Sequence, residues 1–201
     1  MQDNKTKSSK TMIGSFVAVF LMVFLDQITK YFAAVKLKGQ EPFPLIDGVF
    51  QLRYLENQSA AFSFDPISFL HKIFHISFFN AHPDAFLACK MAFFVILTVA
   101  VLIFLGVLYR RIPWNRHFFF MNLVFIGFFA GAIGNLIDRI MHNYVIDFFD
   151  FTLINFPIFN VADIYVTISA IALILMVFFV YKEEDYEVIF PPKKNTDKKE
   201  S

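Results

Sequence analysis

Four long apolar stretches constrain this chain more than any other feature of its sequence. They cover residues 12–35, 86–109, 118–140 and 159–181. Each is close to the roughly 20 mostly apolar residues that a helix needs to cross the hydrocarbon core of a bilayer. Backbone groups that face lipid must be hydrogen-bonded within their own segment, so all four stretches are predicted to be transmembrane helices.

The composition supports a membrane protein and excludes some partners. Of the 201 residues, 57% are hydrophobic and 30 are Phe, which is more apolar than an ordinary soluble domain. The net charge of +1 gives no basic footprint, so we expect no nucleic-acid partner. Cys89 is the one cysteine in the sequence, so no disulfide can form within the chain.

The basic residues predict the orientation of the helices. They gather before the first stretch (Lys5, Lys7, Lys10), between the second and third (Arg110, Arg111, Arg116) and after the fourth (Lys182, Lys193, Lys194, Lys198, Lys199). Such regions stay in the cytoplasm by the positive-inside rule. We therefore expect a basic cytoplasmic N-terminus over residues 1–11, a disordered cytoplasmic tail over 182–201, and outer segments over 36–85 and 141–158.

The first stretch also has some features of a signal peptide, because a basic start precedes the apolar run Met12–Leu25. However, the polar segment Asp26–Lys30 follows at once, apolar residues resume at Tyr31, and a cleavage site between small residues is hard to place. We expect the segment to be retained as a membrane helix.

The outer segments have structure-forming patterns of their own. Asp47-Gly48 is a turn signal, and Val49–Leu55 has the β-branched and aromatic residues of a strand, which predicts a small strand pair. Residues 66–83 have apolar residues at helical spacing, typical of an amphipathic element on the membrane interface. The predicted fold is an all-α membrane protein with four transmembrane helices, one domain over residues 12–181, and a small β-containing extracytoplasmic element.

Polar residues from distant parts of the chain are predicted to lie at one depth, near the outer leaflet. They are Asp26, Lys30, Asn135, Asp138, Arg139, Asn160 and Asp163, with Asp147 in the adjoining outer segment. An ionisable group inside a membrane helix costs about 2.5–3.5 kcal/mol and normally turns toward the bundle interior. Two carboxylates that share one proton, such as Asp147 and Asp163, could activate water and protonate a leaving group.

Five short motifs carry a resemblance to a known family. In chain order they are Asp26-Gln-Ile-Thr-Lys30, Asn57-Gln-Ser-Ala-Ala-Phe62, Gly131-Ala-Ile-Gly-Asn-Leu-Ile-Asp-Arg139, Val145-Ile-Asp-Phe148 and Phe159-Asn-Val-Ala-Asp163. This set resembles the motifs of the bacterial lipoprotein signal peptidase (signal peptidase II) family. Each motif alone is weak, but five in order at one membrane depth are specific.

The resemblance implies an aspartyl endopeptidase of the bacterial cytoplasmic (inner) membrane that removes signal peptides from diacylglyceryl-modified prolipoproteins. The implied partners are this lipid-modified substrate, membrane lipid and inhibitory cyclic peptide antibiotics such as globomycin, with no metal or other cofactor. By motif, Asp147 and Asp163 are similar to the catalytic pair. Asn135, Arg139 and Asn160 correspond to an orienting polar shell, and Asp26, Lys30 and Asn57 to structural or substrate-positioning residues.

The chain departs from the family pattern in two places. Ser59 stands where the family usually has Gly, and a positive φ at that position would strain a serine or reshape the turn. The outer segment 64–85 is longer than usual for the family, and the sequence assigns it no role.

Several residues have alternative interpretations. Asp163 could be a structural acid paired with Arg139, and Asp150 competes with Asp147 because spacing alone does not separate them. Asp138 fits an ion pair with Arg139 or Lys30 as well as a direct role, and Asp26 with Lys30 fits a fold-locking pair better than chemistry. His71, His75 and His82 lack the Glu of a His-Glu-x-x-His motif, so no metal site is predicted.

Two functions from other classes compete with the protease. Membrane-embedded charges also mark transporters and proton relays, but a relay needs them distributed across the bilayer, whereas these gather near one leaflet. A non-catalytic assembly factor that binds lipidated chains is the third hypothesis. Substitution of Asp147 or Asp163 would distinguish it from an enzyme.

Overall fold

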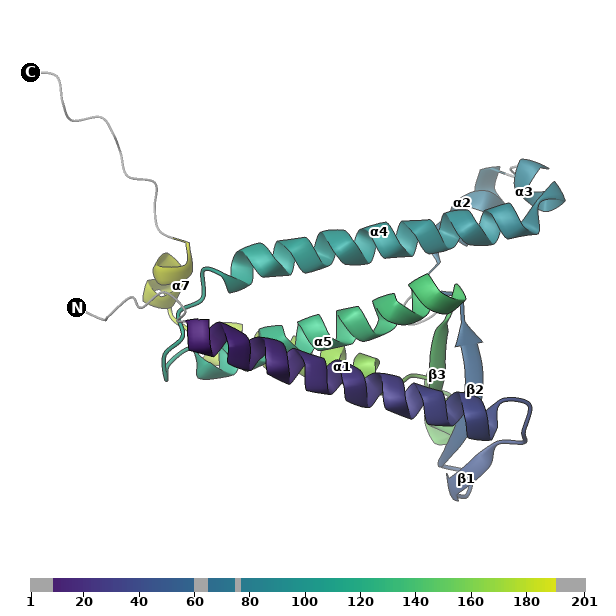
Figure 1. The fold of residues 1–201 in the computed structure, drawn as a ribbon, viewed down its shortest axis with the longest axis horizontal. Helices are drawn as coiled ribbons and strands as arrows, with labels where there is room; N and C mark the ends of the chain where they lie inside the picture. Colours follow the sequence, from purple (N-terminus) through teal and green to yellow (C-terminus); the bar gives the residue numbers. More distant parts are fainter. Residues whose placement is uncertain (1–8, 60–64, 75–76, 191–201) are drawn as a thin grey trace, which may run out of the picture.

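The computed structural model describes residues 9–59, 65–74 and 77–190. Within these residues four helices are long and apolar enough to cross a membrane, which confirms the predicted fold class. They are α1 (Ser9–Leu37), α4 (Pro83–Tyr109), α5 (Phe119–His142) and α6 (Val161–Phe179). Each lies within a few residues of the stretch that predicted it (Figure 1).

Helix α5 is the centre of the bundle, because it packs against α1, α4 and α6. Two glycines allow α6 to approach closely. A Cβ atom added at Gly131 would lie 2.5 Å from the carbonyl oxygen of Ala162, and one added at Gly127 would overlap the Ser169 hydroxyl. Small residues at four-residue spacing commonly mediate such contacts between membrane helices.

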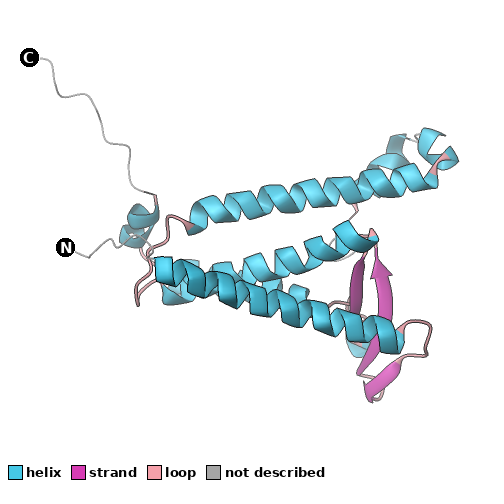
Figure 2. Cartoon of the chain, in the orientation of Figure 1, coloured by secondary structure: helices cyan, strands magenta, loops and turns pink. Residues whose placement is uncertain are grey.

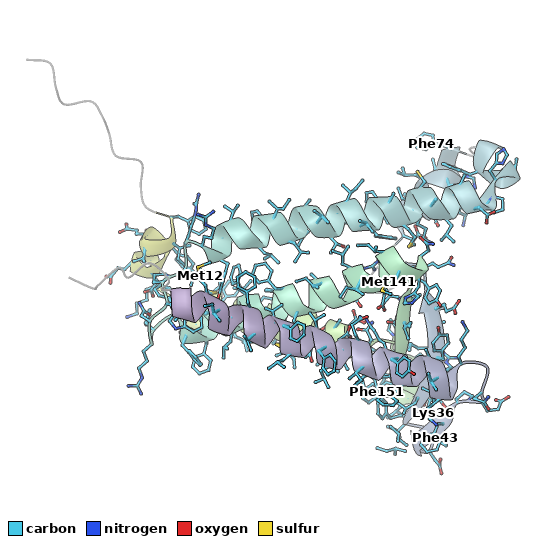
Figure 3. The ribbon with its side chains drawn as sticks, viewed as in Figure 1. Met12, Lys36, Phe43, Phe74, Met141 and Phe151 are labelled. Atoms are coloured by element: carbon cyan, nitrogen blue, oxygen red, sulfur yellow. The ribbon has the colours of Figure 1, made fainter. Side chains whose placement is uncertain are left out.

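The outward faces of the helices are apolar. Phe16 and Phe20 on α1, Ile96 on α4 and Phe178 on α6 are all more than half exposed. Figure 3 shows side chains projecting outward along the helices, from Met12 near one end of the bundle to Met141 near the other. These faces suit the hydrocarbon core of a bilayer.

A three-stranded antiparallel sheet lies at one end of the bundle, with strand order β1-β2-β3 (Figure 2). Its strands are β1 (Phe43–Ile46), β2 (Phe50–Asn57) and β3 (Val145–Asp150). The β1–β2 hairpin confirms the predicted strand pair. Strand β3 was not predicted, because nearly all its residues are buried and it lacks the apolar–polar alternation of a half-exposed strand.

The segment before α4 is helical. It forms α2 (Pro66–Phe74) and α3 (Ser77–Ala81). Asp65 accepts a hydrogen bond from the backbone N–H of Ser68 at 2.9 Å and pairs with Lys90 Nζ of α4 at 2.5 Å. The long outer segment is thus attached to α4 through a salt bridge, while its contact with the membrane interface stays a prediction.

The structure differs from the predicted disordered tail over helix α7 (Glu183–Ile189). Ile189 is buried in an apolar cluster with Phe118 and Tyr181. Asp185 accepts from the backbone N–H of Lys182 at 3.0 Å and from His117 Nε2 at 2.8 Å. The sequence predicted disorder here because most residues of this segment are charged, although one face of the short helix is buried. Residues 191–201 of the predicted tail and 1–8 of the predicted N-terminus lie outside the described residues.

Candidate active site

Asp147 lies on β3 and is almost completely buried, at 1% exposure. Asn57 at the end of β2 donates through Nδ2 to Asp147 Oδ2 at 2.8 Å. Asn160 donates through its own Nδ2 to Asp147 Oδ1 at 2.7 Å. Antiparallel pairing of β2 with β3 brings Asn57 to this carboxylate across 90 residues of sequence.

Asp163 is the third residue of α6 and is only partly buried. It forms a capping box with Asn160. The backbone N–H of Asp163 donates to Asn160 Oδ1 at 3.0 Å, and the backbone N–H of Asn160 donates to Asp163 Oδ2 at 3.0 Å. Asn135 on α5 donates to Asp163 Oδ1 at 2.9 Å. The acid therefore stands in the first turn of its helix, at the edge of the apolar span.

Asn160 joins the two acids. Its fully buried side chain bonds Asp147 directly and caps the helix turn that carries Asp163. The structure thus brings the two predicted carboxylates to one site at the sheet end of the bundle. Among the described residues, neither of them forms a salt bridge.

Burial raises the pKa of Asp147 from its ordinary value of 3.8 to about 7, and the charge of Asp163 adds to this effect. The hydrogen bonds from Asn57 and Asn160 act in the opposite direction, because their N–H groups favour the ionised form. Near neutral pH this carboxyl group can both hold and release a proton. A general acid needs that property.

A second cluster of acids lies next to the first and is neutralised differently. Lys30 Nζ is 2.9 Å from Asp26 Oδ2 and 3.0 Å from Asp138 Oδ2, and it donates to Asn135 Oδ1 at 2.9 Å. Lys30, Asp26 and Asp138 are all buried. The geometry fits the interpretation of Asp26 and Lys30 as a fold-locking pair, and it gives Asp138 the partner Lys30.

Arg139 is near both acids without pairing with either. Its Nη2 donates to the backbone oxygen of Ser59 at 3.3 Å, and its guanidinium lies 5.3 Å from the centre of the Phe94 ring. The charges of Asp147 and Asp163 still act on it electrostatically. In the described part of the chain, hydrogen bonds from amides hold Asp163, so the structure does not support the alternative Asp163–Arg139 pair.

The competitor Asp150 is also buried on β3 but has different partners. Arg53 Nε approaches Asp150 Oδ2 at 3.1 Å, and Gln51 Nε2 donates to the same oxygen at 2.8 Å. A cation therefore compensates Asp150, whereas Asp147 faces Asn160. This difference in partners separates two acids that spacing alone could not.

Two further positions refine the prediction. Ser59 donates its backbone N–H to Asn57 Oδ1 at 2.8 Å. Among the described residues with a side chain, only Asn143 and Asn155 have a positive φ, so Ser59 does not have the strained backbone considered above.

The sequence analysis did not identify Gln27 as a site residue. It donates to Asp26, Asp138 and the Gly134 carbonyl, and only its place between Asp26 and Lys30 could have indicated it.

No metal-binding group of three or more His, Cys, Asp or Glu side chains occurs within the described ranges. His71 contacts Asn80 Oδ1 at 3.2 Å and the Phe86 ring at 5.0 Å between centres. His75 lies outside those ranges.

Four helices long and apolar enough to cross a membrane, with a small sheet packed against α1 and α5, define a polytopic membrane protein. The family model described as signal peptidase (SPase) II matches residues 18–179, which include every motif above. The chain belongs to this family of proteases, as its motifs predicted.

Relatives support the same family along most of the chain. A lipoprotein signal peptidase of Caldanaerobacter subterraneus subsp. tengcongensis is 38% identical over 166 residues, covering 82% of this chain and 96% of that protein. One of Halothermothrix orenii is 33% identical over 160 residues, covering 80% and 92%. A solved bacterial membrane enzyme, determined by the in meso method, matches with a TM-score of 0.65 and 27% identity, covering 100% of this chain and 99% of that one.

Proposed function

We propose that this chain is an intramembrane aspartyl endopeptidase that removes the signal peptide from diacylglyceryl-modified prolipoproteins. The family and the names of its relatives support the removal of signal peptides from lipoproteins. One observation carries the aspartyl mechanism. Asn160 is hydrogen-bonded to both Asp147 and Asp163, so a partly exposed acid stands beside a buried one whose pKa is about 7.

The two acids take different roles in the proposed reaction. Asp163 is at the N-terminal end of α6, where the helix dipole favours negative charge, and its partial exposure would let water reach it. It accepts a proton from water as the oxygen attacks the peptide carbonyl carbon. Asp147 donates its proton to the carbonyl oxygen. The C–N bond then breaks, and the departing nitrogen takes a proton from the pair.

The surrounding amides fit this division of roles. Asn57, Asn135 and Asn160 orient the carboxyl groups through neutral N–H donors, so they fix geometry without supplying a positive charge. Arg139 on α5 donates to the backbone oxygen of Ser59, two residues after β2, and in the proposed reaction it orients the substrate backbone. Asp26 and Lys30 act from the adjoining ion-pair cluster.

The proposed site faces the outer side of the bacterial cytoplasmic membrane. The loop between α4 and α5, with Arg110, Arg111 and Arg116, and helix α7 lie at the end of the bundle opposite the sheet (Figure 1). The positive-inside rule assigns that end, and both termini, to the cytoplasm. The diacylglyceryl chains of the substrate would lie in lipid beside the site, at the depth of Asp147 and Asp163. Cyclic peptides such as globomycin would inhibit there.

A cleavage assay tests the enzyme directly. Purified protein in lipid is given a diacylglyceryl-modified prolipoprotein, and Asp147→Asn and Asp163→Asn are compared with wild type. Loss of acid–base catalysis should lower the rate by about 10²–10⁴-fold. Asp150→Asn is the matched control, since it is a buried acid on the same strand, and we expect its rate to stay within a few-fold of wild type.

Two outcomes would contradict parts of the proposal. Processing at the normal rate by either Asp147→Asn or Asp163→Asn would exclude the acid pair. Wild-type protein that binds the lipidated precursor without cleaving it would favour the assembly factor. An unlipidated precursor tests the role of the lipid, and turnover equal to that of the modified form would contradict it.

A further inference from the structure

The backbone just before each proposed catalytic acid is held by another, buried carboxylate. On the α6 side, Asp26 Oδ1 accepts a hydrogen bond from the backbone N–H of Ala162 at 2.8 Å. Ala162 directly precedes Asp163, and both partners of the bond have 0% exposure. Helix α1 therefore fixes the first turn of α6, across 136 residues of sequence.

The β3 side repeats this arrangement. Asp138 Oδ2 accepts from the backbone N–H of Ile146 at 3.0 Å, and Ile146 directly precedes Asp147. Asp138 lies on α5 and is 1% exposed. The last turns of α5 thereby fix the strand that carries the buried acid.

Two side chains of α1 connect these two anchors. Lys30 Nζ is 2.9 Å from Asp26 Oδ2 and 3.0 Å from Asp138 Oδ2. Gln27 Nε2 donates to Asp26 Oδ2 at 3.1 Å and to Asp138 Oδ1 at 3.0 Å. We call Asp26, Gln27, Lys30 and Asp138 the clamp. It joins the peptide unit before Asp163 to the peptide unit before Asp147.

The clamp has little room to move. A Cβ atom added at Gly134 on α5 would lie 2.5 Å from Asp26 Oδ2, and Gln27 also donates to the Gly134 carbonyl oxygen at 3.1 Å. Hydrogen bonds to ionised carboxylates are about twice as strong as those between neutral groups. The backbone N–H groups of Ile146 and Ala162 are thus each bound to a buried carboxylate in tightly packed surroundings.

We propose that the clamp sets the separation of the Asp147 and Asp163 carboxyl groups, and that Gln27 and Asp138 are positioning residues for peptide hydrolysis. The inference rests on the proposed function, because it concerns the geometry of that acid pair. A displacement of about 1 Å among reacting groups can lower a rate by about 10²-fold. A clamp with this role therefore affects the chemical step more than substrate binding.

Gln27→Met tests the clamp, because it removes the bridging N–H donor and keeps the size of the side chain and the ion pairs of Lys30. In the full-length enzyme in lipid, we expect kcat to fall about 10–100-fold while KM changes less than about twofold. The high-pH limb of the rate profile should move to lower pH. A wider and wetter pair repels less and is better solvated, which lowers the pKa of Asp147.

Thr29→Val is the matched control on the same helix. Among the described residues its hydroxyl donates to the Asp26 backbone oxygen at 2.7 Å and to no side chain of the clamp, so the substitution leaves the clamp intact. We expect kcat and the pH profile of this variant to equal those of wild type.

Asp138 provides a graded test. Asp138→Asn keeps an oxygen that can accept from the Ile146 N–H, whereas Asp138→Leu keeps none. Assayed below the melting temperature of each variant, the Asn form should retain clearly more kcat than the Leu form. Equal kcat in the two folded variants would overturn the role of Asp138.

Hydrogen exchange separates failure of the clamp from failure of the proposed function. In Gln27→Met, peptides that contain Ile146 and Ala162 should exchange faster, with no change in α4. Unchanged exchange at both peptides overturns the clamp whatever the enzyme does. A lower melting temperature with unchanged kcat and pH profile also overturns it. An inactive wild type with faster exchange in Gln27→Met would refute the proposed function while the clamp geometry stands.

Discussion

The two carboxylate clusters of this protein are adjacent and largely buried, yet they are neutralised in different ways. Asp26 and Asp138 share the ammonium group of Lys30. Asp147 and Asp163 are bound only by amides and backbone N–H groups among the described residues. A buried charge needs either a counter-ion or a proton. This difference fits the proposed roles, in which the acids that share a cation are structural and the pair without a cation keeps a proton for chemistry.

Asn135 belongs to both clusters and connects them. Its Oδ1 accepts from Lys30 Nζ at 2.9 Å, and its Nδ2 donates to Asp163 Oδ1 at 2.9 Å. Because an ammonium group can only donate, Lys30 determines which end of the amide points toward Asp163. Lys30 of the first cluster thereby orients the Asn135 amide, which donates to Asp163 of the second cluster.

The largest expected effect comes from removing the cation. Lys30→Met leaves two buried carboxylates without their counter-ion and should lower the free energy of unfolding by about 3–5 kcal/mol. Lys38→Met is the control, since Lys38 pairs with Glu56 at the surface at 2.7 Å, and we expect it to lower the free energy of unfolding far less than Lys30→Met does. Chemical unfolding in mixed micelles measures both. Equal costs would remove the distinction between the buried pair and the surface pair.

For Asp147, in contrast to Lys30, we expect replacement of the charged residue to stabilise the protein at high pH. The folded-state pKa of Asp147 is raised from 3.8 to about 7, so its stabilising contribution is complete below about pH 4 and is lost as pH rises to 7. Asp147→Asn has no such loss. The stability of the variant relative to wild type should increase by on the order of 4 kcal/mol between pH 4 and pH 8. A relative stability that does not change with pH would show that the buried acid carries no unusual cost.

A smaller effect is expected from the removal of one hydrogen bond to Asp147. Asn57 favours the ionised form of Asp147, so Asn57→Ala should raise the pKa of Asp147 and move the high-pH limb of kcat/KM upward by about one unit. Gln51→Ala is the matched control on β2, because Gln51 makes the equivalent bond to Asp150. A downward shift, or the same shift in both variants, would refute the assignment of Asp147 as the acid.

Local patterns predicted the spans and the identity of most site residues, because a helix must be long and apolar to cross a bilayer and charges within it are rare. They did not predict β3, so spacing alone could not separate Asp147 from Asp150, and the choice of Asp147 rested on the motif resemblance. Residues three apart on a strand point to opposite faces, so the strand itself separates an acid facing Asn160 from one facing Arg53.

Other features depend on contacts that no local pattern encodes. The bond from Ala162 to Asp26 spans 136 residues, and the packing of Ile189 in α7 depends on Phe118 and Tyr181. No local pattern marks Gln27 as important, because two of its hydrogen-bond partners, Gly134 and Asp138, are on α5. The sequence thus indicated which residues matter, while tertiary structure decides which of them are partners.

The capping box at the start of α6 has a practical consequence for anyone seeking to capture this protein with an uncleaved substrate. Replacement of Asp163 disturbs a helix cap together with one of the two proposed catalytic acids, so the first turn of α6 should fray beside the proposed site. Asp147 caps no helix, and an asparagine there retains one oxygen that can accept from Asn57 or from Asn160. Asp147→Asn is accordingly the better trap for cocrystallisation.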